Sequence, residues 1–228
     1  MSPKHVAIIM DGNRRWAKSH DLSFLEGYKK GVENLYITVE NFIELKIKFL
    51  TVFGFSTENW NRSALEINKL MILFDSFLDE SIEKIKSKNV KIRFIGDFSK
   101  FDKNIQDKIN RLSLLSENNK GLTLTLAVNY GGRSDIVNAV NKLVCDEKSN
   151  KVDEKKFSKY IMNSDVPNPD LLIRTGSEKR LSNFLLWDLA YTELLFLNEM
   201  WPEFDMKLLK YSIKEFKKRI RNYGGNYV

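Results

Sequence analysis

The chain has 228 residues, of which 43% are hydrophobic and 29% charged, and its formal net charge is +7. This composition allows a substantial core and excludes a globally disordered chain. The single cysteine, Cys145, excludes an intramolecular disulfide framework and a cysteine-based zinc site. The positive charge predicts anionic partners, namely phosphates, nucleic acid or acidic lipid. A reducing, cytoplasmic setting fits these features best.

The apolar runs of the chain are short. The first of them, Val6 to Met10, is shorter than the core of a signal peptide. No run approaches the roughly 18 apolar residues that are needed to span a bilayer. We therefore expect a soluble, cytoplasmic protein whose contact with a membrane, where it occurs, is peripheral.

Short β-rich runs alternate with longer helical patterns. Strands are predicted at Val6–Met10, Phe49–Phe55, Val90–Ile95, Leu122–Val128 and Leu171–Ile173, and helices at residues 70–85, 134–144 and 207–221. Several of the strands are apolar on both faces, which suits a parallel sheet covered by helices on both sides. Because no repeat or flexible linker interrupts this alternation, we predict an α/β fold in one domain, residues 1–228, with a central, mostly parallel sheet.

Polar sequence rich in arginine follows four of the five predicted strands. The four segments are Asp11–Arg15, Ser56–Arg62, Asn129–Arg133 and Arg174–Gly176. In an open α/β sheet, ligands bind beyond the carboxyl ends of the strands, so these segments should converge on one edge. Guanidinium groups bind phosphate oxygens bidentately, and the candidates for this role are Arg15, Arg62, Arg133, Arg174 and Arg180. A surface arginine is the alternative for each of them taken alone.

The segment after the first strand begins with Asp11, Gly12 and Asn13. Gly12 permits a tight backbone and close approach of a ligand, and the amides at the start of the next helix can hold phosphate. The carboxylate of Asp11 repels phosphate, but a Mg²⁺ ion can bridge the two groups. The alternative for this motif alone is an Asx turn with a helix cap.

Several other chemistries lack the residues that they need. The chain has no Gly-x-Gly-x-x-Gly, no phosphate-loop Gly-Lys-Ser/Thr and no His-Glu-x-x-His, and its two histidines, His5 and His20, cannot form a multi-histidine metal site. A phosphotransferase or phosphatase that uses the arginine-rich edge stays open as an alternative. A nucleic-acid-binding module fits the net charge, but no RNA-binding aromatic motif or helix-turn-helix pattern supports it.

Four blocks of sequence carry a resemblance to a known family. They are HVAIIMDGNRRWAK, FGFSTENWNR, LAVNYGGRSDIVNA and DLLIRTGSEKRLSNFLLWDLAYTELLF, the last followed by Trp201-Pro202-Glu203-Phe204. In this order they resemble the signatures of the cis-prenyltransferases of the undecaprenyl diphosphate synthase type, and they cover nearly the whole chain. The Asp-Asp-x-x-Asp signature of trans-prenyltransferases is absent.

The resemblance implies a cis-prenyltransferase fold with a hydrophobic tunnel. It implies a homodimeric, Mg²⁺-dependent enzyme that adds isopentenyl diphosphate units to an allylic diphosphate, with farnesyl diphosphate as the expected primer. The expected product is undecaprenyl diphosphate, a lipid carrier precursor for cell-wall glycan synthesis. A peripheral membrane contact is expected at product release, and nucleic acid is not an expected partner. A catalytically silent partner subunit is a further alternative, and the intact motif residues argue against it.

The resemblance also implies roles for individual residues. Asp11 and Asn59 match catalytic positions, and Asp11 and Glu193 match positions linked to the metal. The substrate-binding positions are matched by Gly12, Asn13, Arg14, Arg15, Trp16, Ser56, Thr57, Glu58, Trp60, Arg62, Arg174, Arg180 and Ser182. Among these, Asn13 and Arg15 match residues near the allylic diphosphate, whereas Arg174, Arg180 and Ser182 match the isopentenyl diphosphate pocket.

The chain departs from the family pattern at a few of these positions. Phe24 and Tyr28 stand where an arginine and a histidine are usual, and Arg14 stands where glycine is common. Our hypothesis is that Arg14 restores part of the missing positive charge. We also expect the helix from Leu70 to Ile85 to line the tunnel, with ordinary core as the alternative reading of its spacing.

Overall fold

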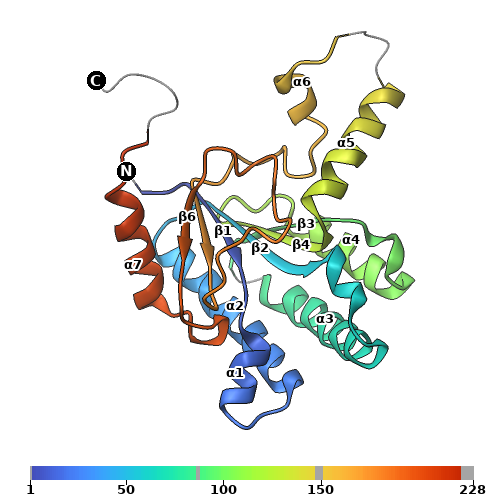
Figure 1. The fold of residues 1–228 in the computed structure, drawn as a ribbon. Helices are drawn as coiled ribbons and strands as arrows, with labels where there is room; N and C mark the ends of the chain where they lie inside the picture. The colour runs from blue at the N-terminus through green and yellow to red at the C-terminus, as the bar shows by residue number, and fades with distance from the viewer. Residues whose placement is uncertain (1, 86–87, 147–150, 222–228) are drawn as a thin grey trace.

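The computed structural model describes residues 2–85, 88–146 and 151–221 and contains a six-stranded parallel sheet in the order β3-β4-β2-β1-β5-β6 (Figure 1). The strands are β1 (His5–Ile9), β2 (Phe49–Ser56), β3 (Lys91–Ile95), β4 (Thr123–Tyr130), β5 (Leu171–Arg174) and β6 (Glu193–Phe196). The predicted fold class, a single α/β domain with a parallel sheet, is confirmed. All five predicted strands form, with ends shifted by at most two residues, and β6 is additional.

Helices cover both faces of this sheet. They are α1 (Asn13–Ser19), α2 (Phe24–Glu44), α3 (Ala64–Ile85), α4 (Lys103–Ser116), α5 (Gly132–Asp146), α6 (Glu154–Ser158) and α7 (Met206–Lys217), and three short 3₁₀ helices are η1 (Thr57–Asn61), η2 (Phe98–Lys100) and η3 (Trp201–Glu203). The three helices predicted from the sequence correspond to α3, α5 and α7. Figure 1 shows α2 and α3 on one side of the sheet and α5 with α6 on the other.

The alternation of side chains along β1 divides the core into two clusters. Val6 and Ile8 belong to the larger cluster, which includes residues of α2, α3, α4 and α7. Ala7 and Ile9 belong to a smaller cluster, in which Phe184 stacks on the strands. Successive residues of a strand point to opposite faces, so a strand that is buried on both sides must be apolar at every position. This requirement explains the continuous apolar run at the start of the chain.

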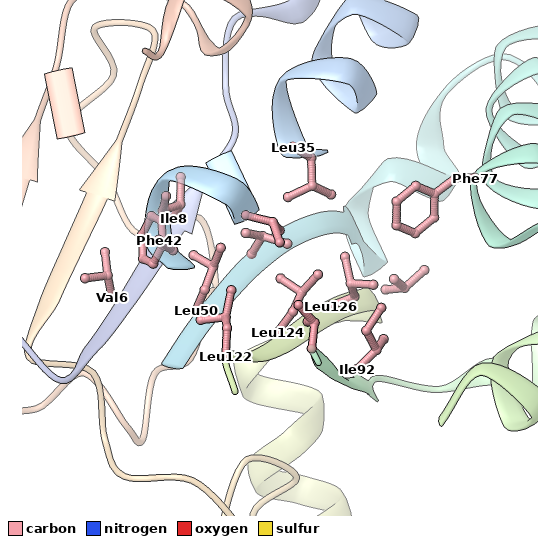
Figure 2. Close-up of a cluster of buried hydrophobic side chains, with 14 of the residues drawn as sticks. Val6, Ile8, Leu35, Phe42, Leu50, Phe77, Ile92, Leu122, Leu124 and Leu126 are labelled. Atoms are coloured by element: carbon pink, nitrogen blue, oxygen red, sulfur yellow. The ribbon is translucent and has the colours of Figure 1, made fainter. Parts of the chain in front are cut away.

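Helix α2 has local signals that fix where it begins and which face it buries. Ser23 and Glu26 form a capping box, in which the Ser23 side chain accepts from the Glu26 amide and the Glu26 side chain accepts from the Ser23 amide. Leu35, Val39 and Phe42 repeat at helical spacing and are buried against the sheet. Figure 2 shows Leu35 of α2 and Phe77 of α3 in the upper part of the view, with Leu124 and Leu126 of β4 below these two side chains.

None of the helices in the described part of the chain is long and apolar enough to cross a membrane.

Candidate active site

A cavity of about 620 Å³ opens at the carboxyl ends of the strands, on the face covered by α2 and α3. Its polar lining consists of Asp11, Gly12, Asn13, Arg14, Arg15, Tyr28, Ser56, Asn59, Arg62, Arg174, Arg180 and Ser182. Its apolar lining includes Val32, Leu35, Phe55, Leu70, Met71, Leu73, Phe74 and Phe77. Residues of three of the four predicted segments, those after β1, β2 and β5, meet at this mouth, whereas none of Asn129–Arg133 lines the cavity. The cavity joins an arginine-rich mouth to an apolar interior.

Asp11 lies at the centre of one wall of this mouth. Its carboxylate is 3.1 Å from Nη2 of Arg15 and 2.9 Å from Nη2 of Arg174. Ile9 pairs with Arg174 in the sheet, so the segment that follows β1 must pass beside the end of β5. The hydroxyl of Thr175 fixes this segment further, because it donates to the Asp11 carbonyl at 2.7 Å and accepts from the Asp11 amide at 3.0 Å. Two adjacent strands thus place one carboxylate between two guanidinium groups.

The guanidinium of Arg174 is held on its other side by the loop that follows β5. Its Nη1 donates to the hydroxyl of Ser182 at 2.7 Å and to the carbonyl of Arg180. The side chain of Arg174 is buried, whereas the side chain of Arg180 is exposed and paired with Glu178. The loop therefore holds one arginine in a fixed position and leaves the other free to move toward a ligand.

Two glycines allow the backbone to approach this wall closely. Gly176 has φ +81°, and a Cβ there would lie 2.6 Å from Nη2 of Arg15 and 3.1 Å from the Asp11 carbonyl. Gly12 has φ +112°, as the predicted tight turn requires, and a Cβ there would lie 2.8 Å from Cβ of Met200. A side chain at either position would displace the residues of the mouth.

A second wall of the mouth, formed by Arg14, Arg62 and Tyr28, is backed by a carboxylate, Glu66, which is not itself in the cavity lining. Glu66 accepts from Nη1 of Arg62 at 3.1 Å and from Nη1 of Arg14 at 3.3 Å. Nη1 of Arg62 also donates to the hydroxyl of Tyr28 at 2.6 Å. Arg62 is the extended residue that ends the 3₁₀ helix η1, and Glu66 lies in the first turn of α3, so the turn between the two helices brings the two side chains together. Arg14, which stands where the family has glycine, is therefore already paired with a carboxylate.

The 3₁₀ helix after β2 carries other predicted site residues. The side chain of Asn59 accepts from the Ser56 amide at 3.0 Å, and both residues line the cavity. Trp60 instead packs against Phe55 and donates to the side chain of Asn129 at 2.8 Å. Trp60 thus supports the site from behind its wall.

Six of the residues that the sequence predicts for the site lie outside the cavity lining. They are Trp16, Thr57, Glu58, Trp60, Arg133 and Glu193. Trp16 stacks on His20 with ring centroids 4.3 Å apart. Glu58 accepts from the side chain of Asn183 at 2.8 Å, and hydrogen bonding helps to keep its pKa below the ordinary value. These contacts give Trp16 and Glu58 structural partners in the protein itself.

Helix α3 contributes only part of its apolar surface to the cavity. Leu70 and Leu73 line it, and Phe74 and Phe77 extend this face by one turn. Leu78 and Ile82 are buried in the core beside the sheet and are not in the lining. Of the four residues that we expected to line a tunnel, Leu70 and Leu73 line the cavity, whereas Leu78 and Ile82 belong to the ordinary core.

Glu193 lies far from Asp11 within one chain. It is the first residue of β6 and pairs with Leu171 at the start of β5, whereas Asp11 lies beyond the opposite end of the sheet. Three residues of a parallel strand, about 10 Å, separate the level of Glu193 from that of Arg174. Glu193 accepts from Arg219 at 2.8 Å. The structure therefore does not bring Asp11 and Glu193 together in one metal site of a single chain.

An oxygen donor suitable for Mg²⁺ is nevertheless present at the mouth, because the carboxylate of Asp11 is 29% exposed. The side-chain oxygen of Asn13 has no hydrogen-bond partner in the described part of the chain, but it is buried against Gly31 of α2. The described residues contain no cluster of three or more histidine, cysteine or acidic side chains that could hold a metal alone. Mg²⁺ commonly takes one or two carboxylates together with substrate phosphates, so this donor set fits that mode.

Glu66 and its contact with two arginines were not foreseen from the sequence. One local signal was available, because Arg62 and Glu66 have the i, i+4 spacing of a helical ion pair. The contact with Arg14 had no such signal, since it depends on how α1 packs relative to α3.

Known proteins resemble this chain along nearly its whole length. A family model described as "Putative undecaprenyl diphosphate synthase" matches residues 9–224. An isoprenyl transferase of Neisseria meningitidis is 44% identical over 97% of this chain and 89% of its own length. A ditrans,polycis-undecaprenyl-diphosphate synthase of Pectobacterium atrosepticum, named as specific for (2E,6E)-farnesyl diphosphate, is 42% identical over 98% of this chain and 90% of its own length.

Solved structures that share the fold include the following two. Lavandulyl diphosphate synthase from Lavandula x intermedia, in complex with dimethylallyl diphosphate, superposes with a TM-score of 0.94 at 37% identity and covers 98% of this chain and 99% of its own. A probable undecaprenyl diphosphate synthase from Campylobacter jejuni superposes with a TM-score of 0.85 at 34% identity. The match covers 99% of this chain and 100% of the other.

Fold, cavity and sequence similarity together define a prenyltransferase, as the motifs predicted. The chain belongs to the undecaprenyl diphosphate synthase family of prenyltransferases.

Proposed function

We propose that the protein extends farnesyl diphosphate with isopentenyl diphosphate to a long-chain Z-polyprenyl diphosphate, with undecaprenyl diphosphate as the product. The observation that carries this proposal is that one cavity has both an arginine-rich part and an apolar part. Arginines surround its mouth, where diphosphates would bind, and apolar residues of α2 and α3 line its interior, where a hydrocarbon chain would lie. A phosphatase or phosphotransferase would need only the first of these two features.

The two walls of the mouth suggest how the two substrates are arranged. In this proposal the allylic diphosphate lies over Asn13, Arg15 and the start of α3, so that its chain enters the apolar interior. Isopentenyl diphosphate lies against Arg180, Ser182 and the loop after β5. Both diphosphates then face positively charged arginine side chains, which stabilise the negative charge of the phosphate oxygens.

The chemistry follows from this arrangement. The bond between the allylic carbon and its diphosphate oxygen breaks, and the diphosphate leaves with the electron pair. The isopentenyl double bond attacks the allylic carbon and forms the new carbon–carbon bond, and a proton leaves the isopentenyl unit to restore a double bond. Arg15 and Arg62 would stabilise the charge that develops on the leaving diphosphate, and Asn59 would keep the Ser56 turn in place beneath it.

We include Mg²⁺ in the proposal, with Asp11 as its protein ligand. Bound there, the ion would supply positive charge to the diphosphate oxygens. Asp11 also keeps Arg15 and Arg174 in position through its two ion pairs. Glu193 could join this site only from outside the single chain, because its own β6 places it at the other end of the sheet.

One incubation tests the function. The protein is mixed with farnesyl diphosphate and labelled isopentenyl diphosphate, with Mg²⁺ or with a chelator, and the lipid products are separated by chain length. We expect Mg²⁺-dependent products with many added units. Release of inorganic phosphate without any longer lipid would favour the phosphatase alternative and overturn the proposal.

A second experiment tests whether the α3 face is the tunnel. Leu73→Trp places a large ring on the cavity side of the helix, and we expect shorter products with the first condensation preserved. Ile72→Trp is the matched control, because Ile72 is the neighbouring residue and is 67% exposed on the outer side. Unchanged product length in a folded Leu73→Trp variant would assign this face to ordinary core.

We also propose that the enzyme works in the cytoplasm as a homodimer and contacts the membrane surface when it releases its apolar product. Val137, Val140 and Val144 are exposed along one side of α5 and give a second subunit an apolar surface to cover. Analytical ultracentrifugation measures the oligomeric state, and flotation with anionic vesicles measures the membrane contact. A monomer at micromolar concentration that still elongates the primer would contradict the dimer.

A further inference from the structure

Helix α7 carries a row of lysines on its outer side. Its buried residues include Leu209 and Phe216, which belong to the larger core cluster. Since successive residues of a helix turn by about 100°, the lysines of α7 and its C-cap share a single face opposite these two side chains. All of them are exposed, and we call them the lysine stripe: Lys207, Lys210, Lys214, Lys217 and Lys218.

The charge of the lysine stripe is largely unpaired. Residues 206–221 contain five lysines, two arginines and one acid, so this segment carries +6 of the net charge of +7. The one acid, Glu215, is paired with Lys218, and both arginines have partners elsewhere in the chain. The other four lysines of the stripe have no ion-pair partner among the described residues. The stripe therefore offers concentrated positive charge to an anionic partner.

Apolar side chains accompany these charges. Tyr211 lies within the stripe and is 48% exposed, and Ile220, just beyond the helix, is 75% exposed. Tyrosine is favoured where water meets the hydrocarbon of a bilayer, because its ring is apolar and its hydroxyl is polar. A basic helix face with exposed apolar side chains is typical of a helix that lies on a membrane surface. Nucleic acid would account for the lysines but not for Ile220.

The lysine stripe is open to a partner of large extent. Figure 1 shows α7 at the outer edge of the sheet, beside β6 and away from α5. The exposed valines that we propose as a dimer surface lie on α5, so a dimer formed there leaves the stripe uncovered. An extended, nearly flat surface such as a bilayer can therefore contact the whole length of α7.

Helix α7 begins close to the cavity mouth. Trp201 of η3 lines the cavity, and its amide donates to the Asp11 carbonyl at 2.9 Å. The chain then reaches Asp205, whose side chain caps α7 by accepting from the Leu208 amide at 2.8 Å. A protein bound through α7 would therefore hold the mouth of its cavity near the surface to which it is bound.

We propose that the lysine stripe docks the protein on a bilayer of anionic lipid, with Tyr211 and Ile220 in contact with the headgroup region. This inference rests on the proposed function for its purpose, since a long apolar product needs a bilayer to receive it. Each basic residue held near an anionic surface strengthens binding by about fivefold. The attraction is screened by salt, so docking is reversible and depends on ionic strength.

Flotation of the native protein with lipid vesicles is the first test. One set of vesicles contains phosphatidylglycerol and phosphatidylcholine in equal parts, and the other contains phosphatidylcholine alone. We expect binding to the first set only, with a loss of about tenfold or more when salt rises from about 0.1 M to about 1 M. Equal binding to both sets, or binding that salt does not change, would overturn the inference without any variant.

Two triple variants of equal charge then locate the contact. The stripe variant combines Lys210→Gln, Lys214→Gln and Lys217→Gln. The matched control removes three exposed lysines from α4, the loop before β4 and α6, and combines Lys103→Gln, Lys120→Gln and Lys155→Gln. We expect the stripe variant to bind anionic vesicles about tenfold more weakly or less, and the control to stay within about twofold of native.

The comparison has a clear contrary result. Equal losses in the two folded variants would assign the binding to net charge alone, and native binding by the stripe variant would place the contact elsewhere. A stripe variant with arginine at the same three positions keeps the charge and should bind as the native protein does. RNA that binds the native protein more tightly than the anionic vesicles do, and that the stripe variant no longer binds, would favour nucleic acid and overturn the inference.

These measurements use no substrate, so they separate docking from the proposed function. A protein that floats with anionic vesicles through its stripe but does not elongate farnesyl diphosphate would retain the docking surface and lose the function. A protein that elongates the primer but does not float would retain the function and lose the docking surface.

Discussion

The two walls of the cavity mouth use the same arrangement in different surroundings. In one wall Asp11 lies between Arg15 and Arg174, and in the other Glu66 lies between two further arginines. The Asp11 side chain is 29% exposed, and that of Glu66 is only 10% exposed. Asp11 follows a strand and is fixed by the sheet, whereas Glu66 lies in the first turns of α3.

This difference shows how one residue pattern can serve two purposes. A carboxylate that remains open to the cavity can exchange an arginine partner for a metal or a diphosphate-bound ion. A carboxylate enclosed between two guanidinium groups mainly holds those groups in position and reduces the positive charge that they present. We therefore propose that Asp11 acts in the reaction and that Glu66 acts through the arginines that it holds, and four variants test this division.

The largest effect is expected for Asp11→Asn. Asparagine keeps an oxygen that can accept from Arg174, so the fold should remain, but the charge that would hold Mg²⁺ is lost. We expect kcat to fall about 100-fold or more, with a much smaller change in primer affinity. Steady-state kinetics measures kcat and the KM for the primer, and a circular-dichroism melt serves as the control for folding. A folded variant with kcat near native would remove Asp11 from the reaction.

Glu66→Gln makes the corresponding change in the other wall and should produce a different kind of defect. Two arginines lose their shared counterion, and we expect the free energy of unfolding to fall by about 1–2 kcal/mol. The KM for the primer should change, while kcat at saturating primer falls much less than for Asp11→Asn. Urea unfolding and kinetics on the same samples test this. Equal losses of kcat in the two variants would show that the walls do not differ in the way we describe.

Arg180→Ala separates the exposed arginine of the first wall from the buried one. The Arg180 side chain is exposed and has only Glu178 as an ion-pair partner in the described structure, so its loss should leave Asp11 in place. We expect the KM for isopentenyl diphosphate to rise about tenfold, from the loss of a charge-assisted contact. Arg174→Ala is the comparison, since it removes a partner of Asp11 and should lower kcat as well. An increase confined to the primer KM would mean that the two substrate positions are reversed.

Arg14→Gly should have the smallest effect. Arg14 is 59% exposed and shares Glu66 with Arg62, so only part of its charge is available to the primer. We expect farnesyl diphosphate to bind a few-fold more weakly, with a larger defect at low ionic strength, where screening is weaker. Arg14→Lys keeps the charge and serves as the control for the helix. Native affinity at both ionic strengths would discard the hypothesis that Arg14 replaces charge missing at Phe24 and Tyr28.

The sequence predicts the sheet well because its strands are buried on both faces. Runs such as Val6–Met10 and Leu122–Val128 are continuous and apolar, and each is followed by a polar turn. Strand β6 lacks this signal, since it lies at the sheet edge and its residues are mostly half-buried. Helix α2 is not among the predicted helices, although Ser23 and Glu26 form a capping box at its start.

The candidate site was predictable where the backbone alone brings residues together. Asp11 and Arg174 follow paired strands, so their proximity follows from the parallel order of β1 and β5. The contacts of Glu66 depend instead on how α1, α2 and α3 pack against one another, which no local pattern encodes. For the same reason the sequence could not separate Leu73, which lines the cavity, from Leu78, which belongs to the core.

Leu35, Leu70 and Phe77 belong to the main hydrophobic core and also line the cavity. The interior of the protein is thus an incomplete core, and a bound polyprenyl chain would bury apolar surface against the same side chains that stabilise the fold. Each added unit buries more surface, at about 25 cal/mol per Å². A ligand that binds only the native state raises the stability of that state. The melting temperature of the protein would therefore increase with the length of the polyprenyl chain that it binds. Each round of elongation would then stabilise the folded protein further, and release of the product would return the protein to its less stable, unliganded form.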